Sequence, residues 1–247
     1  MYKIKSMFNL KSFKNIGVTL YLFIYLIFPY SAITQTTKIN LRSSLEKSLN
    51  SRNLEVLKES FRDASSLEVL TRFANIINEF PDSKWKIKEL NSNKPDEKLF
   101  QIKVFGKKVV DEEIYTLEST FNYFFSSLKG KINKGTINKL FTIIRNDDKK
   151  IDITFKIPDK VLTGTKYDID IILNEPLEEV IVAGGIINHQ VKSFLEQEIN
   201  LEPLVSGGIF KITRAPSQPG MQIWSGIIAH PHGIITFTKS IDVVKNL

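Results

Sequence analysis

The spacing of the apolar residues changes at Pro81, and this change limits the folds that the chain can adopt. Between residues 40 and 80 the apolar residues recur every three or four positions, which is typical of amphipathic helices. After Pro81 they alternate with polar residues, which is typical of strands that bury one face. Helices followed by a long run of strands predict an α+β arrangement.

The predicted strands fall into two groups. In the first group, residues 100–104 alternate, and we expect a turn at Gly106–Lys108. A longer strand follows, and Ile137, Phe141 and Ile143 mark a return strand. Residues 146–150 form a polar break, and the short alternating segments beyond it predict a β-sandwich. We therefore expect an α+β domain at 40–147 and an all-β domain at 149–246.

Residues 1–37 have the pattern of a targeting segment. Four lysines and no acidic residue occur among the first 15 residues, and a nearly continuous apolar run follows at 16–33. Secretory signal peptides and uncleaved N-terminal anchor helices share this pattern, and the length of the run does not separate them. We expect an exported protein, periplasmic or otherwise extracytoplasmic, that is either free or anchored in the membrane by residues 16–33.

The basic charge does not favour nucleic acid as a partner. Subtracting the four N-terminal lysines from the 34 basic residues leaves 30, against 27 acidic residues. Such a nearly balanced surface lacks the electrostatic signature of a nucleic-acid-binding domain. The chain also contains no cysteine, which excludes disulfides, thiolate metal sites and cysteine nucleophiles.

Two segments carry a resemblance to known proteins. The helices and strands of residues 41–146 resemble the nuclear transport factor 2-like superfamily, in which helices close a cone of curved antiparallel sheet. Residues 206–216, with Trp224 and the last strand, resemble the C-terminal part of uncharacterised bacterial exported proteins that pair such a domain with an Ig-like β-sandwich. The resemblance implies this pair of folds and no particular activity, because the superfamily includes enzymes, binders and adaptors.

Short motifs do not indicate chemistry. The tetrapeptide His230-Pro231-His232-Gly233 contains two imidazoles, but its proline and glycine suit a type I turn between two strands. The glycine pairs Gly184-Gly185 and Gly207-Gly208 do not open a helix that continues with Lys-Ser or Lys-Thr, as a phosphate-binding loop requires. We therefore assign no catalytic residue, metal ligand or cofactor.

Aromatic residues on the longest predicted strand suggest a ligand pocket. Tyr115, Phe121 and Tyr123 share one face of this strand, and Trp85 is expected nearby. In a cone this face lines the cavity, where aromatic walls with hydroxyl groups suit an apolar ligand carrying a few polar groups. Alternatively, the same residues pack against the predicted helices and form part of the hydrophobic core. These four residues are the candidate pocket residues, with both interpretations open.

Two functions remain. The first is a binding or scaffold protein of the cell envelope that engages another envelope protein or a small apolar ligand. The alternative is a cone-fold isomerase or hydrolase that uses a buried carboxylate, because residues 39–150 contain neither histidine nor cysteine. Asp63 and Glu79 are examples of such carboxylates.

Overall fold

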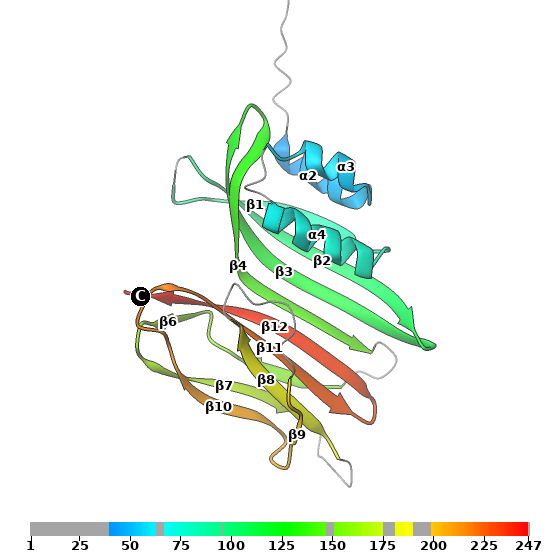
Figure 1. The fold of residues 1–247 in the computed structure, drawn as a ribbon, viewed down its shortest axis with the longest axis vertical. Coiled ribbons are helices and arrows are strands. Elements are labelled where there is room, and N and C mark those ends of the chain that lie inside the picture. Colours follow the sequence, from blue (N-terminus) through cyan, green and yellow to red (C-terminus); the bar gives the residue numbers. More distant parts are fainter. Residues whose placement is uncertain are drawn as a thin grey trace, which may run out of the picture. The chain divides into compact units, whose positions relative to one another are not determined.

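The computed structural model describes residues 40–62, 67–94, 96–146, 151–174, 181–189 and 199–246, with the backbone alone for Leu67 and Glu68. These residues belong to one compact unit that begins at Asn40. They contain three helices and twelve strands (Figure 1).

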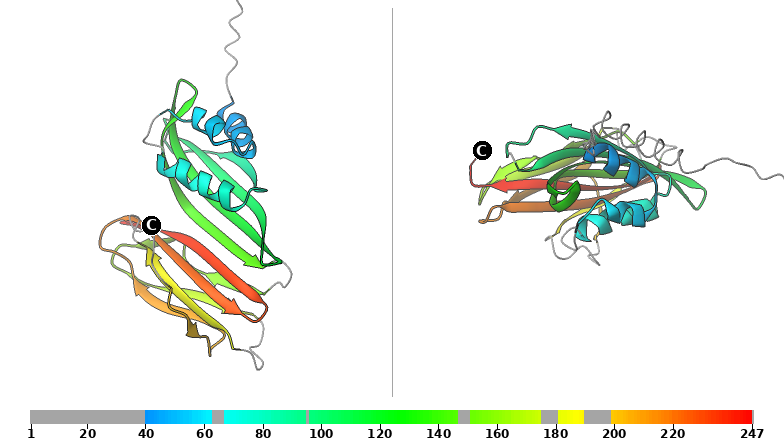
Figure 2. Two further views of the ribbon diagram at one scale, coloured as in Figure 1. Left: turned by 45° about the vertical axis from the view of Figure 1, so that its right-hand side comes forward. Right: turned by 90° about the horizontal axis from the view of Figure 1, so that it is seen from above.

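The three helices precede all of the strands. They are α2 (Leu41–Asn50), α3 (Leu54–Glu59) and α4 (Leu67–Glu79). Asparagine side chains cap the first two, because Asn40 accepts from the amide of Ser43 and Asn53 accepts from that of Glu55. The helices bury apolar residues mostly four positions apart, namely Leu41, Leu45, Leu49, Leu57, Val69, Phe73 and Ile77. They thereby cover one face of the first strands (Figures 1 and 2).

Four antiparallel strands form a meander under the helices. They are β1 (Lys84–Leu90), β2 (Lys98–Val110), β3 (Glu113–Leu128) and β4 (Lys131–Asn146). The turn expected at Gly106–Lys108 is wrong, because β2 continues through it. A Cβ atom at Gly106 would lie 2.9 Å from that of Phe80, so this glycine allows a close approach within the strand. The turn follows at Asp111 and Glu112, both with positive φ.

The meander continues into a larger sheet. Its strand order is β1-β2-β3-β4-β12-β11-β8-β9, and β6 pairs in parallel with β12. The added strands are β6 (Lys160–Leu162), β8 (Ala183–His189), β9 (Glu202–Pro203), β11 (Gly220–His230) and β12 (Gly233–Val244). The β11–β12 hairpin turns at Pro231 and His232, which confirms the predicted turn.

A second, three-stranded sheet faces the C-terminal part of the first. Its order is β10-β7-β5, with β5 at Ile153–Lys156, β7 at Lys166–Leu173 and β10 at Gly208–Arg214. Side chains from both sheets form a common core, a sandwich arrangement, and its members include Ile169, Ile171, Trp224, Ile228, Phe237 and Ile241. The helices and the meander enclose a separate core around Phe73, Trp85, Phe100 and Tyr123.

The resemblance to a nuclear transport factor 2-like cone followed by an Ig-like sandwich is wrong, and so is the α+β class. The described residues are predominantly antiparallel strand with three short helices. Moreover β4, the last strand of the expected cone, pairs through Phe141–Arg145 with Ile235–Lys239 of β12. One sheet therefore runs through both expected domains. Local periodicity predicts strands, but it does not reveal which strand pairs with the free edge of β4.

The predicted leader or anchor helix at 1–37 lies outside the described residues. None of the described helices combines the length and the apolar character needed to cross a membrane.

A β-bulge in β4 reverses the alternation of its side chains, so that residues an even number of positions apart across the bulge contribute to different cores. Lys139 and Leu140 of β4 stand together opposite Phe121 of β3, because the register moves from Thr120–Phe141 to Asn122–Asn138. As a result Ile137 and Leu140 pack against the helix-covered core, whereas Phe141 and Ile143 belong to the sandwich core. A buried side chain closes the bulge, since the Leu140 amide donates to Ser240 Oγ at 2.8 Å.

We predict that Ser240→Ala lowers the free energy of unfolding by about 1–2 kcal/mol, because the partly buried Leu140 amide then loses its partner. Urea denaturation measures the change. Ser225→Ala is the matched control, because Ser225 is only partly buried whereas Ser240 is 2% exposed, so the loss of stability should be smaller. Equal stability of Ser240→Ala and wild type would contradict a structural role for this bond.

Candidate functional site

The meander carries a concavity on each of its two faces. Because side chains alternate along a strand, Ser119 and Phe121 of β3 point toward α4, and Asn122 and Phe124 point away from it. We call the two concavities the apolar pocket, between α4 and the sheet, and the polar groove, on the opposite face.

The apolar pocket has a volume of about 410 Å³ and mainly apolar walls. Its lining includes Phe73 and Ile76 from α4, Phe80 directly after this helix, and Leu117, Phe121, Leu140 and Ile144 from the sheet. On its sheet side, the hydroxyl groups of Ser119 and Thr142 lie 2.7 Å apart and form a hydrogen bond. The size and the sparse polar groups suit a small apolar ligand.

The structure separates the four predicted pocket residues. Phe121 lines the apolar pocket, whereas Trp85 and Tyr123 are fully buried in the core. All three rings pack around Phe73, at centroid distances of 5.4 Å for Trp85, 5.9 Å for Phe121 and 6.2 Å for Tyr123. Tyr115 lies near the start of β3, where its hydroxyl donates to Glu113 Oε2 at 3.0 Å.

Of the two acids named as possible catalytic groups, Glu79 is not a free carboxylate inside the apolar pocket. Glu79 lies at its edge, with 65% of its side chain exposed, and forms an ion pair of 2.8 Å with Lys108. Asp63 lies outside the described residues.

The Tyr123 hydroxyl has no hydrogen-bond partner among the described residues. Burial raises the pKa of this phenol. The ring lies against Gly135 on β4, where any Cβ atom would clash with the hydroxyl oxygen. Tyr123 therefore fills the space that the glycine leaves open, but its polar tip remains unsatisfied.

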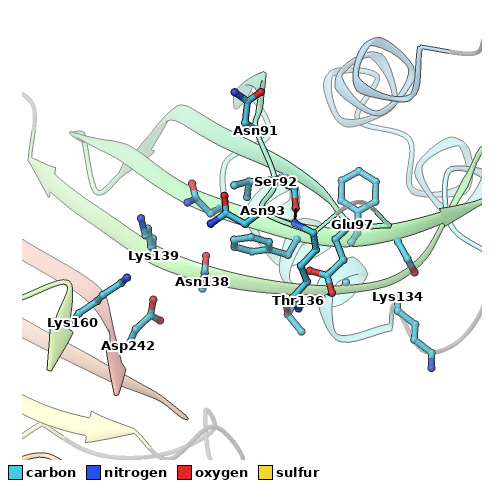
Figure 3. A pocket seen from close by; sticks show the side chains of 17 residues that line it. Asn91, Ser92, Asn93, Glu97, Lys134, Thr136, Asn138, Lys139, Lys160 and Asp242 are labelled. Atoms are coloured by element: carbon cyan, nitrogen blue, oxygen red, sulfur yellow. Dashed lines mark hydrogen bonds and ion pairs between the residues drawn. The ribbon is translucent and has the colours of Figure 1, made fainter. Parts of the chain in front are cut away.

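The polar groove forms where the edge of β12 changes partner. This edge pairs with β4 as far as Lys239 and then with β6 from Asp242 onward. Between these two contacts β4 leaves β12, and a groove of about 870 Å³ opens beside it (Figure 3). Its lining side chains are mostly amides, hydroxyls and charged groups, among them Asn91, Asn93, Asn122, Ser126, Lys134, Thr136, Asn138, Lys139, Lys160 and Asp242.

The bulge of β4 places Lys139 in this groove. Lys139 has a φ of 48°, in the left-handed region that non-glycine residues rarely adopt in strands. Bulges often redirect a side chain beside a functional site, and backbone strain is often found at such sites. Because of the bulge, both Asn138 and Lys139 line the groove, although they are consecutive residues of one strand (Figure 3).

Two amide side chains form a polar patch on the wall of the groove. Asn122 is only 7% exposed, and it stands directly opposite Asn138 in the register of β3 and β4. Asn138 Oδ1 is buried and accepts no hydrogen bond from the described residues. A buried polar atom without a partner is unusual, and Asn138 is also one of the residues that line the groove, so its oxygen is a candidate contact for a ligand.

Positive charge predominates along the groove. Lys134, Lys139 and Lys160 form no salt bridge within the part of the chain that the structure describes. A fourth lysine, Lys94, pairs with Glu97 at 3.0 Å. The groove thus has cationic side chains without a salt-bridge partner among the described residues, and they lie beside its amides.

Asp242 is the acid that lies among these lysines (Figure 3). Partial burial raises the pKa of its carboxyl group, and Asp159 acts in the same direction. Lys139 and Lys160 oppose the shift without reversing it. The two lysines are thus held close to a carboxylate that is poorly solvated.

None of the four candidate pocket residues predicted from the sequence lines the polar groove. One signal was present, because Asn138 and Lys139 place two polar residues between Ile137 and Leu140, where strict alternation allows one. This is the pattern that a bulge produces. Nothing in the sequence, however, placed Lys160 and Asp242 beside it.

Comparison with known proteins identifies one family match. Residues 148–244 match a family described as a domain of unknown function (DUF8623). The match includes Lys160 and Asp242, but Asn122, Asn138 and Lys139 lie before its first residue. No curated protein matches the chain.

We predict that Tyr123→Phe raises the free energy of unfolding by about 1 kcal/mol, because it removes a buried hydroxyl that has no partner. The matched control is Tyr167→Phe. The Tyr167 hydroxyl accepts from Trp224 Nε1 at 3.0 Å and donates to Gln222 Oε1 at 2.9 Å, so its removal should destabilise the fold. A loss of stability in Tyr123→Phe would mean that its hydroxyl does have a partner.

We predict that Asp242→Asn stabilises the protein at pH 7. Since the folded-state pKa is raised above the unfolded value, the ionised form destabilises the folded state above the folded pKa. The gain should shrink as the pH falls through the folded pKa and vanish below the unfolded value of about 3.9. Thermal unfolding between pH 3 and 8 measures it.

Asp168→Asn, which removes an exposed carboxylate from β7, controls for the change in net charge. A destabilised Asp242→Asn at pH 7 would mean that attraction to the lysines outweighs the burial of Asp242.

Proposed function

We propose that this chain is a binding protein that holds an anionic ligand in the polar groove. The observation that carries the proposal is the position of Lys139. A strained bulge, closed by the buried Ser240 hydroxyl, brings its ammonium group into the same groove as Lys160. Neither lysine forms a salt bridge among the described residues, so an anion can bind them without displacing one.

Binding is better supported than catalysis. Asn122 and Asn138 are suited to hydrogen bonding, but neither has an acid or base function in ordinary chemistry. Of the two carboxylates of the groove, Glu97 is paired with Lys94, and Asp242 lies beside two lysines. A site of amides and cations around one carboxylate provides recognition groups without a nucleophile and its base.

Two predictions from the sequence remain separate from this proposal. A small apolar ligand is still a prediction for the apolar pocket, to which Phe121 contributes. Export, and a role at the cell envelope with another protein as partner, rest on residues 1–37 and stay predictions. Anion binding in the polar groove is independent of both the apolar ligand and the export of the protein.

We predict that Lys139→Asn weakens anion binding by roughly tenfold, or about 1.4 kcal/mol, because it removes one of two neighbouring cations. Asparagine tolerates a positive φ, so the bulge should persist. The measurement titrates sulfate, phosphate and glucuronate into the isotope-labelled protein and follows the amide signals of Asn138, Lys139 and Lys160 by NMR.

The matched control is Lys129→Asn, because Lys129 also has a positive φ of 51° but lies in the β3–β4 turn. It should leave anion affinity unchanged. Salt should weaken binding to the wild type, as expected for exposed charges. If no anion shifts the three signals, or if both variants lose affinity equally, the groove is not an anion site.

A further inference from the structure

We infer that the ligand of the polar groove is an acidic oligosaccharide, a chain of sugars that carry carboxylates. This inference rests on the proposed function and adds the chemistry of the ligand to it. It combines three features of the groove: cations, a pair of facing amides of which one has an oxygen without a partner among the described residues, and an aromatic side chain.

A ligand that pairs with the amide oxygen of Asn138 must carry a hydrogen-bond donor in addition to its negative charge. Asn138 Oδ1 is a buried acceptor without a donor among the described residues. A fully ionised carboxylate or sulfate carries acceptors alone, so it binds the lysines but cannot satisfy this oxygen. A hydroxyl group can, because it donates one hydrogen bond and accepts others. The ligand that fits both needs is an anion that also carries hydroxyl groups.

The arrangement of the amides fits a sugar ring. Asn122 and Asn138 are directly opposite each other on neighbouring strands, so their side chains lie close enough to bind neighbouring hydroxyls. Asn122 is only 7% exposed, so the surrounding residues hold its side-chain amide in place before a ligand binds. Lys139 follows Asn138 directly, which places a cation beside the hydroxyl-binding patch.

An aromatic side chain lies on the same face. Phe124 is two residues from Asn122 on β3, lines the groove and is partly exposed. Its ring offers an apolar surface next to hydrogen-bonding groups, and the two faces of a sugar ring combine the same properties. A small inorganic anion makes no use of this surface.

The positions of the lysines favour more than one sugar. Lys134 and Lys139 are five residues apart on β4, which corresponds to about 16 Å along an extended strand. The groove volume of about 870 Å³ is at the upper end of the roughly 300–1,000 Å³ of small-molecule sites. Repeated carboxylates along an oligosaccharide can reach both cationic positions at once.

The test titrates the full chain with three acidic oligosaccharides: oligogalacturonate, oligomannuronate and hyaluronan fragments. The controls are the carboxyl-reduced, neutral form of each oligosaccharide, and sulfate, which has no hydrogen to donate. We expect at least one acidic oligosaccharide to bind at least tenfold more tightly than both its neutral form and sulfate. Calorimetry gives the affinities, and NMR shifts of Asn138, Lys139 and Lys160 locate the site.

Two variants separate the roles of charge and amide. Lys139→Asn should weaken binding of the oligosaccharide and of sulfate. Asn138→Leu should weaken the oligosaccharide roughly tenfold and leave sulfate unchanged, because it removes the hydroxyl-binding group and no charge. If Asn138→Leu does not fold, as judged by its thermal unfolding, Asn138→Ala tests the same point with a smaller side chain that has no hydrogen-bonding group.

The outcomes distinguish this inference from the proposed function. Sulfate binding in the groove without tighter binding of any acidic oligosaccharide would overturn the sugar assignment and leave an anion site. Equal binding of acidic and neutral forms would overturn the role of the lysines. The absence of any anion binding in the groove would overturn both proposals.

Discussion

The hydrogen bond from the Leu140 amide to the buried hydroxyl of Ser240 holds together the point at which the main sheet changes its pairing. It lies where β4 leaves the edge of β12 and β6 begins to pair with it. Without a partner there, the bulge would leave the partly buried Leu140 amide unsatisfied. With it, β4 can contribute to two cores, and the space beside it becomes the polar groove. The position of Lys139 depends on the same bulge.

Each face of the meander serves a different purpose, and the alternation of β3 explains why. The residues that face α4, such as Phe121 and Tyr123, build a core and the wall of the apolar pocket. Those that face away, such as Asn122 and Phe124, line the polar groove. Strand β3 can therefore contribute to the core with one face and to a candidate binding groove with the other, because successive side chains point to opposite faces. The two buried side-chain oxygens without a hydrogen-bond partner among the described residues, Tyr123 Oη and Asn138 Oδ1, also lie on opposite faces of the meander. The first is enclosed in the core, and the second lies in the wall of a groove.

Much of the local structure was predictable, and the site was not. The helical spacing before Pro81, the alternation after it and the turn at His230–Gly233 agree with the observed elements. The aromatic row of Tyr115, Phe121 and Tyr123 is predictable from the alternation along β3, yet of these three residues Phe121 alone lines the apolar pocket. Simple alternation from Ile137 also places Phe141 on the same face, and the bulge separates them. A shift of one residue reverses every later side chain, so one extra residue is enough to defeat the prediction.

The sequence alone determined the order of helices and strands, the buried faces of the regular segments and the absence of cysteine chemistry. These properties depend on the spacing of neighbouring residues, which the printed chain contains. The tertiary structure alone decided that β4 pairs with β12, and so that a single sheet replaces the expected cone and separate sandwich. It also brought Asn122, Asn138, Lys139 and Lys160 together with Asp242, which lies near the end of the chain. Strand pairing between distant segments is set by the best joint burial and hydrogen bonding of the whole chain, and no local pattern encodes it.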